Sequence, residues 1–436
     1  MGADSFPGGF IQKAGSTATR PRLTLSQIQS FVPPRRGLFK FPPPYNTEGI
    51  RVTVPADCHG QDCVSSVGYS YWMNMNNHVG SDTMLIFLGL DRRRGGTGPT
   101  LFSYNKATNE VKNLGPIFDQ RTSFSWYPGV DWYFSARQPT KLYVSDKGSK
   151  FYRYDVLAKS FETVFDVHSR FGADKGATQM HSSGDDEVHS ATLLCKKPGC
   201  TDGVHTAKKD DEMMGCFVYH EHSRTFTYFP RRGIYDECNL DKSGRWLLIL
   251  EGETEDLGNR IIDLENKTEK VLANQAAGRL GHLDMGDGYA VGGNGNNQLP
   301  NTTVLLKFPI TGPGRPGTVV NYNKDWNTAL AGHVSHQNRQ SGVAPEKQYA
   351  CGSNLDDGKA ENEVVCFRLD QSYDTLIVAP IMTNPKAPGD CDDYCKMPKG
   401  NLDVTGRYFI WTSNLGGSRM DAFIAKIPSQ MLFPRQ

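Results

Sequence analysis

Residues 400–414, GNLDVTGRYFIWTSN, join a polar residue, a loop with Asp and Gly, and an apolar strand. The pattern recurs as ECNLDKSGRWLLILEG at 237–252 and as GHLDMGDGYAVGG at 281–293. In all three stretches the polar residue stands seven positions before the first strand residue: Asn401 before Tyr408, Asn239 before Trp246 and His282 before Tyr289. Looser copies occupy 77–89, 125–136, 180–194 and 332–353, which makes seven units.

Strand-rich units that recur at roughly 40–60 residues are typical of the blades of a β-propeller. We therefore expect an all-β, seven-bladed propeller over residues 64–436, preceded or wrapped by an arm over residues 1–63 that is rich in Pro, Gly, Ser and Arg. The strand that ends each unit is expected to be the innermost of its blade. These strands fall near residues 83–90, 131–136, 188–194, 245–251, 288–293, 347–353 and 407–413.

The residue that precedes an innermost strand should lie at one mouth of the central channel. The repeats place seven polar residues there: His78, Ser125, His181, Asn239, His282, His333 and Asn401. Four of the seven are histidines, although the whole chain has 11. Such residues can cap the loops between blades, or they can form a functional ring.

The amino-acid composition argues against two classes of partner, nucleic acids and membranes. The 436 residues carry 48 basic and 47 acidic side chains, so net charge does not direct the protein to nucleic acid or to a membrane surface. The chain also lacks an apolar run of the length that spans a bilayer. We expect a monomer that binds neither nucleic acid nor a membrane.

The ten cysteines form five close neighbours in sequence, which predicts local disulfides and an oxidising compartment. The pairs are Cys58 with Cys63, Cys195 with Cys200, Cys216 with Cys238, Cys351 with Cys366, and Cys391 with Cys395. Sequons at Asn266 and Asn301 are those of a secreted glycoprotein. We expect an extracellular protein.

One cluster has the residue types of a divalent metal site. His333 and His336 stand three apart in a loop, followed by Gln337, and His282 comes from the neighbouring blade. Loop hydrogen bonding is the alternative interpretation. Asp185, Asp186 and Glu187 could instead hold calcium through their carboxylates, or form a solvated turn.

The later blades resemble those of oligogalacturonate lyases in GHLDMGDGYAVGG, AGHVSHQNR and GNLDVTGRYFIWTSNLGGSRMDAFIAKIP. The resemblance implies a manganese ion held by His282, His333, His336 and Gln337. A more distant resemblance to the ulvan lyases and rhamnose–glucuronate lyases, which are also propellers, implies catalytic roles for His78, His181, Tyr219 and Arg232.

These observations predict a lyase that cleaves an anionic, uronic-acid-containing oligosaccharide or polysaccharide by β-elimination. His181 and His78 would transfer protons, and Arg232, or another arginine such as Arg339, would bind the carboxylate. Two alternatives stay open: a propeller that binds carbohydrate or protein without catalysis, and a metal-dependent hydrolase or lactonase.

Overall fold

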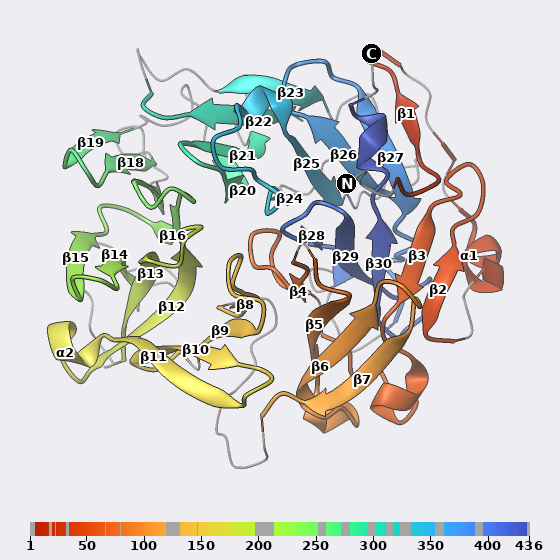
Figure 1. The fold of residues 1–436 in the computed structure, drawn as a ribbon, viewed down its shortest axis with the longest axis horizontal. Coiled ribbons are helices and arrows are strands. Elements are labelled where there is room, and N and C mark those ends of the chain that lie inside the picture. The colour runs from red at the N-terminus through yellow and green to blue at the C-terminus, as the bar shows by residue number, and fades with distance from the viewer. Residues whose placement is uncertain are drawn as a thin grey trace.

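A computed structural model describes most of the chain as seven antiparallel sheets arranged in a ring (Figure 1). The fold is a seven-bladed β-propeller, as the repeats predict. The described residues are 5–16, 20–21, 23–31, 35–65, 67–78, 80–118, 131–145, 147–196, 213–251, 259–271, 280–294, 302–310, 317–322, 333–353, 362–388 and 396–433. Ser125, Cys200, Asn301, Cys391 and Cys395 lie outside them.

Blades I to III follow one another along the chain, each with four strands in sequence order. Blade I contains β4 (Met75–Asn76), β5 (Thr83–Leu90), β6 (Gly98–Asn105) and β7 (Val111–Pro116). Blade II contains β8 (Tyr133–Phe134), β9 (Lys141–Ser145), β10 (Lys150–Asp155) and β11 (Ser160–Asp166). Helix α2 (His168–Phe171) leads to blade III, with β12 (Lys175–Ser182), β13 (Val188–Cys195), β14 (Met213–His220) and β15 (Thr225–Pro230).

Blades IV and V repeat this order. Blade IV contains β16 (Tyr235–Leu240), β17 (Trp246–Glu251), β18 (Arg260–Asp263) and β19 (Thr268–Val271), and blade V contains β20 (Leu280–Met285), β21 (Tyr289–Asn294), β22 (Thr302–Lys307) and β23 (Thr318–Tyr322). Blade VI begins with β24 (Val334–Ser335), β25 (Tyr349–Ser353), β26 (Glu363–Arg368) and β27 (Thr375–Pro380). Blade VII begins with β28 (Asn401–Leu402), β29 (Tyr408–Ser413) and β30 (Asp421–Lys426).

The N-terminal residues complete the last two blades. Strand β1 (Phe10–Gln12) pairs with β27 as the fifth strand of blade VI, and β2 (Gly37–Lys40) and β3 (Glu48–Arg51) extend blade VII beyond β30. Helix α1 (Leu25–Phe31) lies between them in sequence. The segment expected as an arm thus supplies three strands to the propeller and closes the ring by pairing both ends of the chain.

The innermost strands differ from those that the repeats predict. Figure 1 shows the first strand of each blade nearest the centre, namely β4, β8, β12, β16, β20, β24 and β28. The strands expected there are the second strands of their sheets, except at 131–136, which contains β8. Several first strands are very short, and their polar residues hide them among loops in the sequence. The apolar second strands give the stronger signal.

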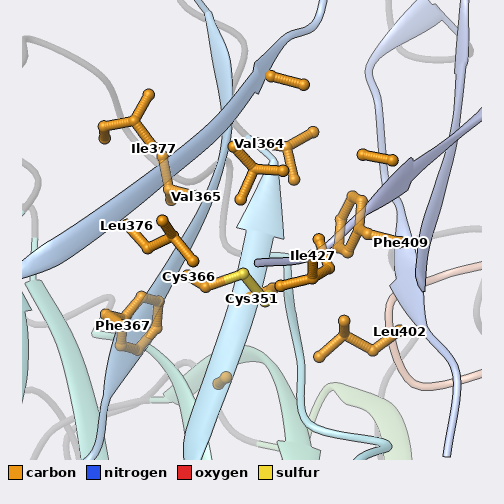
Figure 2. Packing of buried hydrophobic residues seen from close by; sticks show 14 of the residues in the cluster. Cys351, Val364, Val365, Cys366, Phe367, Leu376, Ile377, Leu402, Phe409 and Ile427 are labelled. Atoms are coloured by element: carbon orange, nitrogen blue, oxygen red, sulfur yellow. A yellow bond between two sulfur atoms is a disulfide. The ribbon is translucent and has the colours of Figure 1, made fainter. Parts of the chain in front are cut away.

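The second strands are buried and largely apolar because neighbouring blades cover both of their faces. All six residues of β17 and all six of β29 are buried, whereas the outermost strand β19 has no buried residue. A large apolar cluster joins blades VI and VII, and Figure 2 shows Phe367, Leu376 and Ile377 packed around the disulfide of Cys351 and Cys366.

Three of the predicted disulfides are confirmed: Cys58 with Cys63, Cys216 with Cys238, and Cys351 with Cys366. The Cys216–Cys238 bond joins β14 to β16 and so links blades III and IV. Disulfides are typical of proteins outside the reducing cytosol. Among the described helices, none has the length and apolar character needed to cross a membrane.

Candidate functional site

Strand pairing defines one equivalent position in every blade, at the centre of the ring. At this position a residue of the first strand pairs with the third residue of the second strand. We call these residues the inner ring: Asn76, Tyr133, His181, Asn239, Asp284, Ser335 and Asn401. All seven are buried and all carry a polar group.

Three of the residues that the repeats place at the channel mouth, His181, Asn239 and Asn401, belong to the inner ring within the first strands, and three others stand two residues away from it. His78 follows Asn76, while His282 and His333 precede Asp284 and Ser335. The turns explain the shift. Residues 286–289 separate the last paired residues of blade V, whereas residues 241–246 do so in blade IV. A constant spacing to the second strand therefore misplaces the residue wherever the turn differs in length.

Two positions before the inner ring lies a second set of equivalent residues, which we call the entry ring because the first strands begin on this side. Its members are Asn74, Asp131, Gln179, Glu237, His282, His333 and Lys399. All are polar. Glu237 lies in β16 and shares a face with Asn239, and each other member likewise stands two residues nearer the loop that enters its blade. Glu237, His282, His333 and Lys399 come from four consecutive blades and combine a carboxyl group, two imidazoles and an ammonium group.

The segment Tyr69–Met73, which we call the central segment, lies at the centre of the ring and contacts four blades. The Trp72 Nε1 atom donates to the Met180 carbonyl of blade III at 2.9 Å, and the Tyr71 hydroxyl donates to Glu237 of blade IV at 2.8 Å. Gln337 of blade VI donates to the Tyr71 carbonyl at 3.0 Å. The Met73 carbonyl accepts from Phe134 of blade II. Tyr71 and Trp72 are almost fully buried, whereas Tyr69 is half-buried.

Glu237 is the carboxyl group whose chemistry stands out in the entry ring. Burial, reinforced by the nearby Asp236 carboxylate, raises the pKa of Glu237 to about 8. Its two oxygens bond the Tyr71 hydroxyl and, at 3.3 Å, the Asn239 amide. A carboxyl group that stays protonated near neutral pH can act as a general acid.

His181 lies against the central segment. Its ring stacks on Trp72 with centroids 5.5 Å apart, and Tyr71 lies 5.2 Å away. Burial, and secondarily the Lys242 charge, hold the pKa of His181 well below its ordinary value, so the imidazole is neutral. Its buried Nε2 atom has no hydrogen-bond partner among the residues that the structure describes.

His78 lies on the opposite side of the ring from the central segment, in the turn after β4. Burial and the Lys106 charge lower the pKa of His78, while Asp186 opposes them. The structure thus separates the two histidines expected to share proton transfer: His181 contacts the central segment, and His78 belongs to the turns.

The four predicted metal ligands divide into two groups. His282 and His333 each stand two residues before the inner ring on adjacent blades, and the His282 side chain is outside the described part of the structure. His336 and Gln337 lie beyond the inner ring, at the start of the turn after β24. Gln337 donates to Asp284 at 2.9 Å and to the Tyr71 carbonyl.

His336 does not fit a metal ligand in this arrangement. Its Nε2 atom lies 2.7 Å from the Tyr289 hydroxyl and its Nδ1 atom 2.9 Å from the Tyr349 carbonyl, so both ring nitrogens are bonded within the protein. Burial lowers the pKa of His336 to about 4. Within the described residues, no group of three or more His, Cys, Asp or Glu side chains could hold a metal ion.

The remaining predicted residues lie away from the centre. Tyr219 is in β14, the third strand of blade III, and packs on Phe226 with ring centroids 4.7 Å apart. Arg232 pairs with Glu269 of the outermost strand β19. The acidic turn is held by hydrogen bonds, with Asp186 accepting from Ser135 at 2.6 Å and Asp185 from Ser183 at 2.6 Å.

Sequence reasoning missed the central segment, Glu237 and Lys399. The run GYSYW at 68–72 concentrates aromatics just before a strand, and this composition was the available signal. Glu237 and Lys399 each stand two residues before a repeat position already identified, Asn239 and Asn401. Inspection of the same-face neighbours of the repeat residues would have found both.

Comparison with known proteins identifies solved structures of similar fold. No family model and no curated protein matches the chain. Among solved structures, an oligogalacturonate lyase in complex with manganese matches with a TM-score of 0.60 and 11% identity, over 92% of this chain and 98% of that one. The oligogalacturonate lyase from Vibrio parahaemolyticus matches with a TM-score of 0.59 and 8% identity, over 98% and 100%. At such identities the likeness concerns the fold.

A propeller-containing peptidase is also similar. The acylaminoacyl peptidase from Pyrococcus horikoshii matches with a TM-score of 0.45 and 8% identity, over 84% of this chain and 54% of that one.

Proposed function

We propose that the protein is a carbohydrate-active lyase that cleaves a uronic-acid-containing glycan by β-elimination at the entry ring. The observation that carries the proposal is the cluster around the central segment, in which His333 and Lys399 both lie against the Tyr69 ring and the neighbouring Tyr71 holds Glu237. The likeness of the whole chain to two oligogalacturonate lyases supports the same reaction class.

β-Elimination needs three kinds of group at one place. A cation must neutralise the uronate carboxylate, so that negative charge can develop at the adjacent carbon in the transition state. A base must take the proton from that carbon, and an acid must protonate the leaving glycosidic oxygen. Lys399 supplies the charge, a histidine supplies the base and Glu237 supplies the acid.

We assign the base to His333 rather than to His181. The buried His333 ring lies 5.2 Å from the ring of Tyr69, which is the half-buried residue of the central segment. His181 is covered by Tyr71 and Trp72. Because His336 does not fit a metal ligand, no step of this proposal uses a metal.

The glutamate assignment uses the contacts of the central segment. The Tyr71 hydroxyl and the Asn239 amide hold Glu237 in place, and burial keeps it protonated until a glycosidic oxygen arrives. Loss of a general acid typically lowers a rate by about 10²–10⁴-fold. Glu237→Gln should therefore slow turnover to this degree, and Glu110→Gln, at the exposed β6–β7 turn, is the matched control.

Incubation with polygalacturonate, alginate and glucuronate-containing polysaccharides tests the proposal. Elimination creates a conjugated double bond that absorbs in the ultraviolet, whereas hydrolysis creates reducing ends without it. His333→Ala should abolish the absorbance increase, and His222→Ala, an exposed histidine in the β14–β15 turn, should leave it unchanged. Reducing ends without ultraviolet absorbance would favour the hydrolase alternative, and binding without cleavage would favour a lectin.

A further inference from the structure

Tyr69 and Lys399 lie together at the entry side although they belong to distant parts of the chain. Tyr69 precedes β4 of blade I, and Lys399 precedes β28 of blade VII. The Lys399 Nζ atom lies 5.9 Å from the centroid of the Tyr69 ring, and His333 lies against the same ring. Ring closure between the first and last blades is what brings them into contact.

Tyr69 is held rigidly. Its ring stacks on Tyr71 with centroids 5.6 Å apart and an interplanar angle of 14°, and it meets Trp72 edge-on at 5.8 Å. Tyr71 and Trp72 are in turn fixed by hydrogen bonds to Glu237 and Met180. The half-buried Tyr69 ring thus rests on two buried, hydrogen-bonded residues, Tyr71 and Trp72. These contacts fix its orientation before a ligand binds.

The ammonium group of Lys399 is shielded from solvent. It is 4% exposed and lies in the same entry ring as Glu237, which carries no charge near neutral pH. An ammonium group away from water attracts an anion more strongly than one at the surface, because solvent screens it less. An aromatic ring beside it interacts favourably with the cation and also offers an apolar face.

We infer that Tyr69 and Lys399 form the subsite that selects a uronate sugar: Tyr69 packs against the pyranose ring and Lys399 binds its carboxylate. The inference rests on the proposed function, since it names the substrate group that the lyase site recognises. His333, whose ring lies 5.2 Å from that of Tyr69, is then the base assigned to the same sugar. The subsite accepts the acid form of a sugar and discriminates against its neutral ester.

Equilibrium binding of monosaccharides tests the subsite without any cleavage, because a monosaccharide has no glycosidic bond to break. The probes are galacturonic and glucuronic acid, each with its methyl ester, titrated by calorimetry or ligand-observed NMR. The wild type should bind at least one acid about tenfold or more tightly than its ester, the size of effect expected for a charge-assisted contact. Lys399→Gln should reduce this ratio to near one, and Lys40→Gln in exposed β2 should not.

The tyrosine variants separate stacking from charge. Tyr69→Phe should keep the affinity for both forms, whereas Tyr69→Ala should weaken acid and ester alike by about tenfold. Because Lys399 is buried, Lys399→Met, which keeps the aliphatic stem, serves as a second test if the glutamine variant melts early.

The binding experiment and the cleavage experiment can fail independently, so failure of the subsite can be told apart from failure of the lyase proposal. Selective binding of a uronate that depends on Lys399, with no cleavage of any polyuronate, would support the subsite and contradict the lyase. Cleavage of a polyuronate by a protein that binds acid and ester equally, or whose Lys399 variants bind as the wild type does, would overturn the subsite and leave the lyase standing.

Discussion

Glu237 is a buried carboxyl group whose ionisation makes stability depend on pH. Its pKa is raised from 4.5 in the free side chain to about 8 in the fold. The folded state therefore binds a proton that the unfolded state has lost, so its contribution to stability falls as pH rises from about 4.5 to about 8. Glu237→Gln removes this titration.

We predict that thermal melts recorded across this range will show the wild type losing stability relative to Glu237→Gln as pH rises. The difference should level off above about pH 8. The Glu110→Gln control should follow the wild type at every pH. A constant difference between wild type and Glu237→Gln from acid to alkaline pH would contradict a raised pKa and remove the argument for Glu237 as the acid.

His336 shows why a histidine motif in a loop is ambiguous. Since Tyr289 and Tyr349 occupy both ring nitrogens, we predict a structural role for His336. His336→Ala should lower the free energy of unfolding by about 2–4 kcal/mol, because it leaves a cavity and a buried hydroxyl without its partner. Chemical denaturation measures this cost, with His222→Ala as the control. A fully stable His336→Ala protein would contradict the structural role.

The same residue has a pH signature of opposite sign to that of Glu237. The pKa of His336 falls from 6.5 to about 4 on folding, so the unfolded state binds the extra proton between these values. Its contribution to stability is present above pH 6.5 and is lost as pH falls toward 4. Loss of stability over this acid range should therefore be smaller in His336→Gln than in the wild type, as melts of both proteins would show.

At the scale of elements, the central segment connects several blades of the propeller to the residues of the proposed site. Trp72 is 1% exposed, donates to Met180 and stacks on His181. Trp72→Ala should cost about 3–5 kcal/mol of unfolding free energy, the usual penalty for truncating a large buried aromatic side chain. Trp72→Phe, which keeps an aromatic ring and loses the hydrogen bond, should lower the free energy of unfolding by about 1 kcal/mol. Equal costs would contradict the packing described here.

The N-terminal strands allow a second test at this scale. Deletion of residues 1–16 removes β1, the outermost strand of blade VI, and leaves the rest of that blade paired. Deletion of residues 1–52 also removes β2 and β3 and exposes β30, a strand with six buried residues, as a sheet edge. We predict a folded monomer for the short deletion and aggregation for the long one, measured by size-exclusion chromatography with light scattering. A soluble, folded product of the long deletion would contradict the closure.

The blade count was predictable because each blade repeats one polar–loop–strand unit. Burial of the second strands on both faces makes them apolar and easy to recognise. The repeats also identified His282 and His333 as residues of adjacent blades that stand two positions before the inner ring. Turn lengths vary from blade to blade, so the register between the first and second strands could not be predicted from a constant spacing. Tyr219 and Arg232 were misplaced because residue type alone does not show how far a strand lies from the centre.

At the scale of the whole molecule, the ring architecture gathers residues from the two ends of the chain into one place. Tyr69 and Lys399 are 330 positions apart in the sequence (399 − 69), and closure of blades VI and VII by β1, β2 and β3 makes them neighbours. The disulfide between blades III and IV and the inner-ring contacts between other blades keep the first strands fixed. The proposed site thus depends on the intact propeller, not on any single blade.

The measurement that tests the central claim most directly is the ultraviolet absorbance of polyuronate solutions incubated with the wild type and with His333→Ala. Elimination by the wild type should produce a steady absorbance increase with at least one polyuronate, absent from His333→Ala and preserved in His222→Ala. If no polyuronate yields absorbing products with the wild type, or if His333→Ala produces them at the wild-type rate, the entry ring is not the site of a uronate lyase.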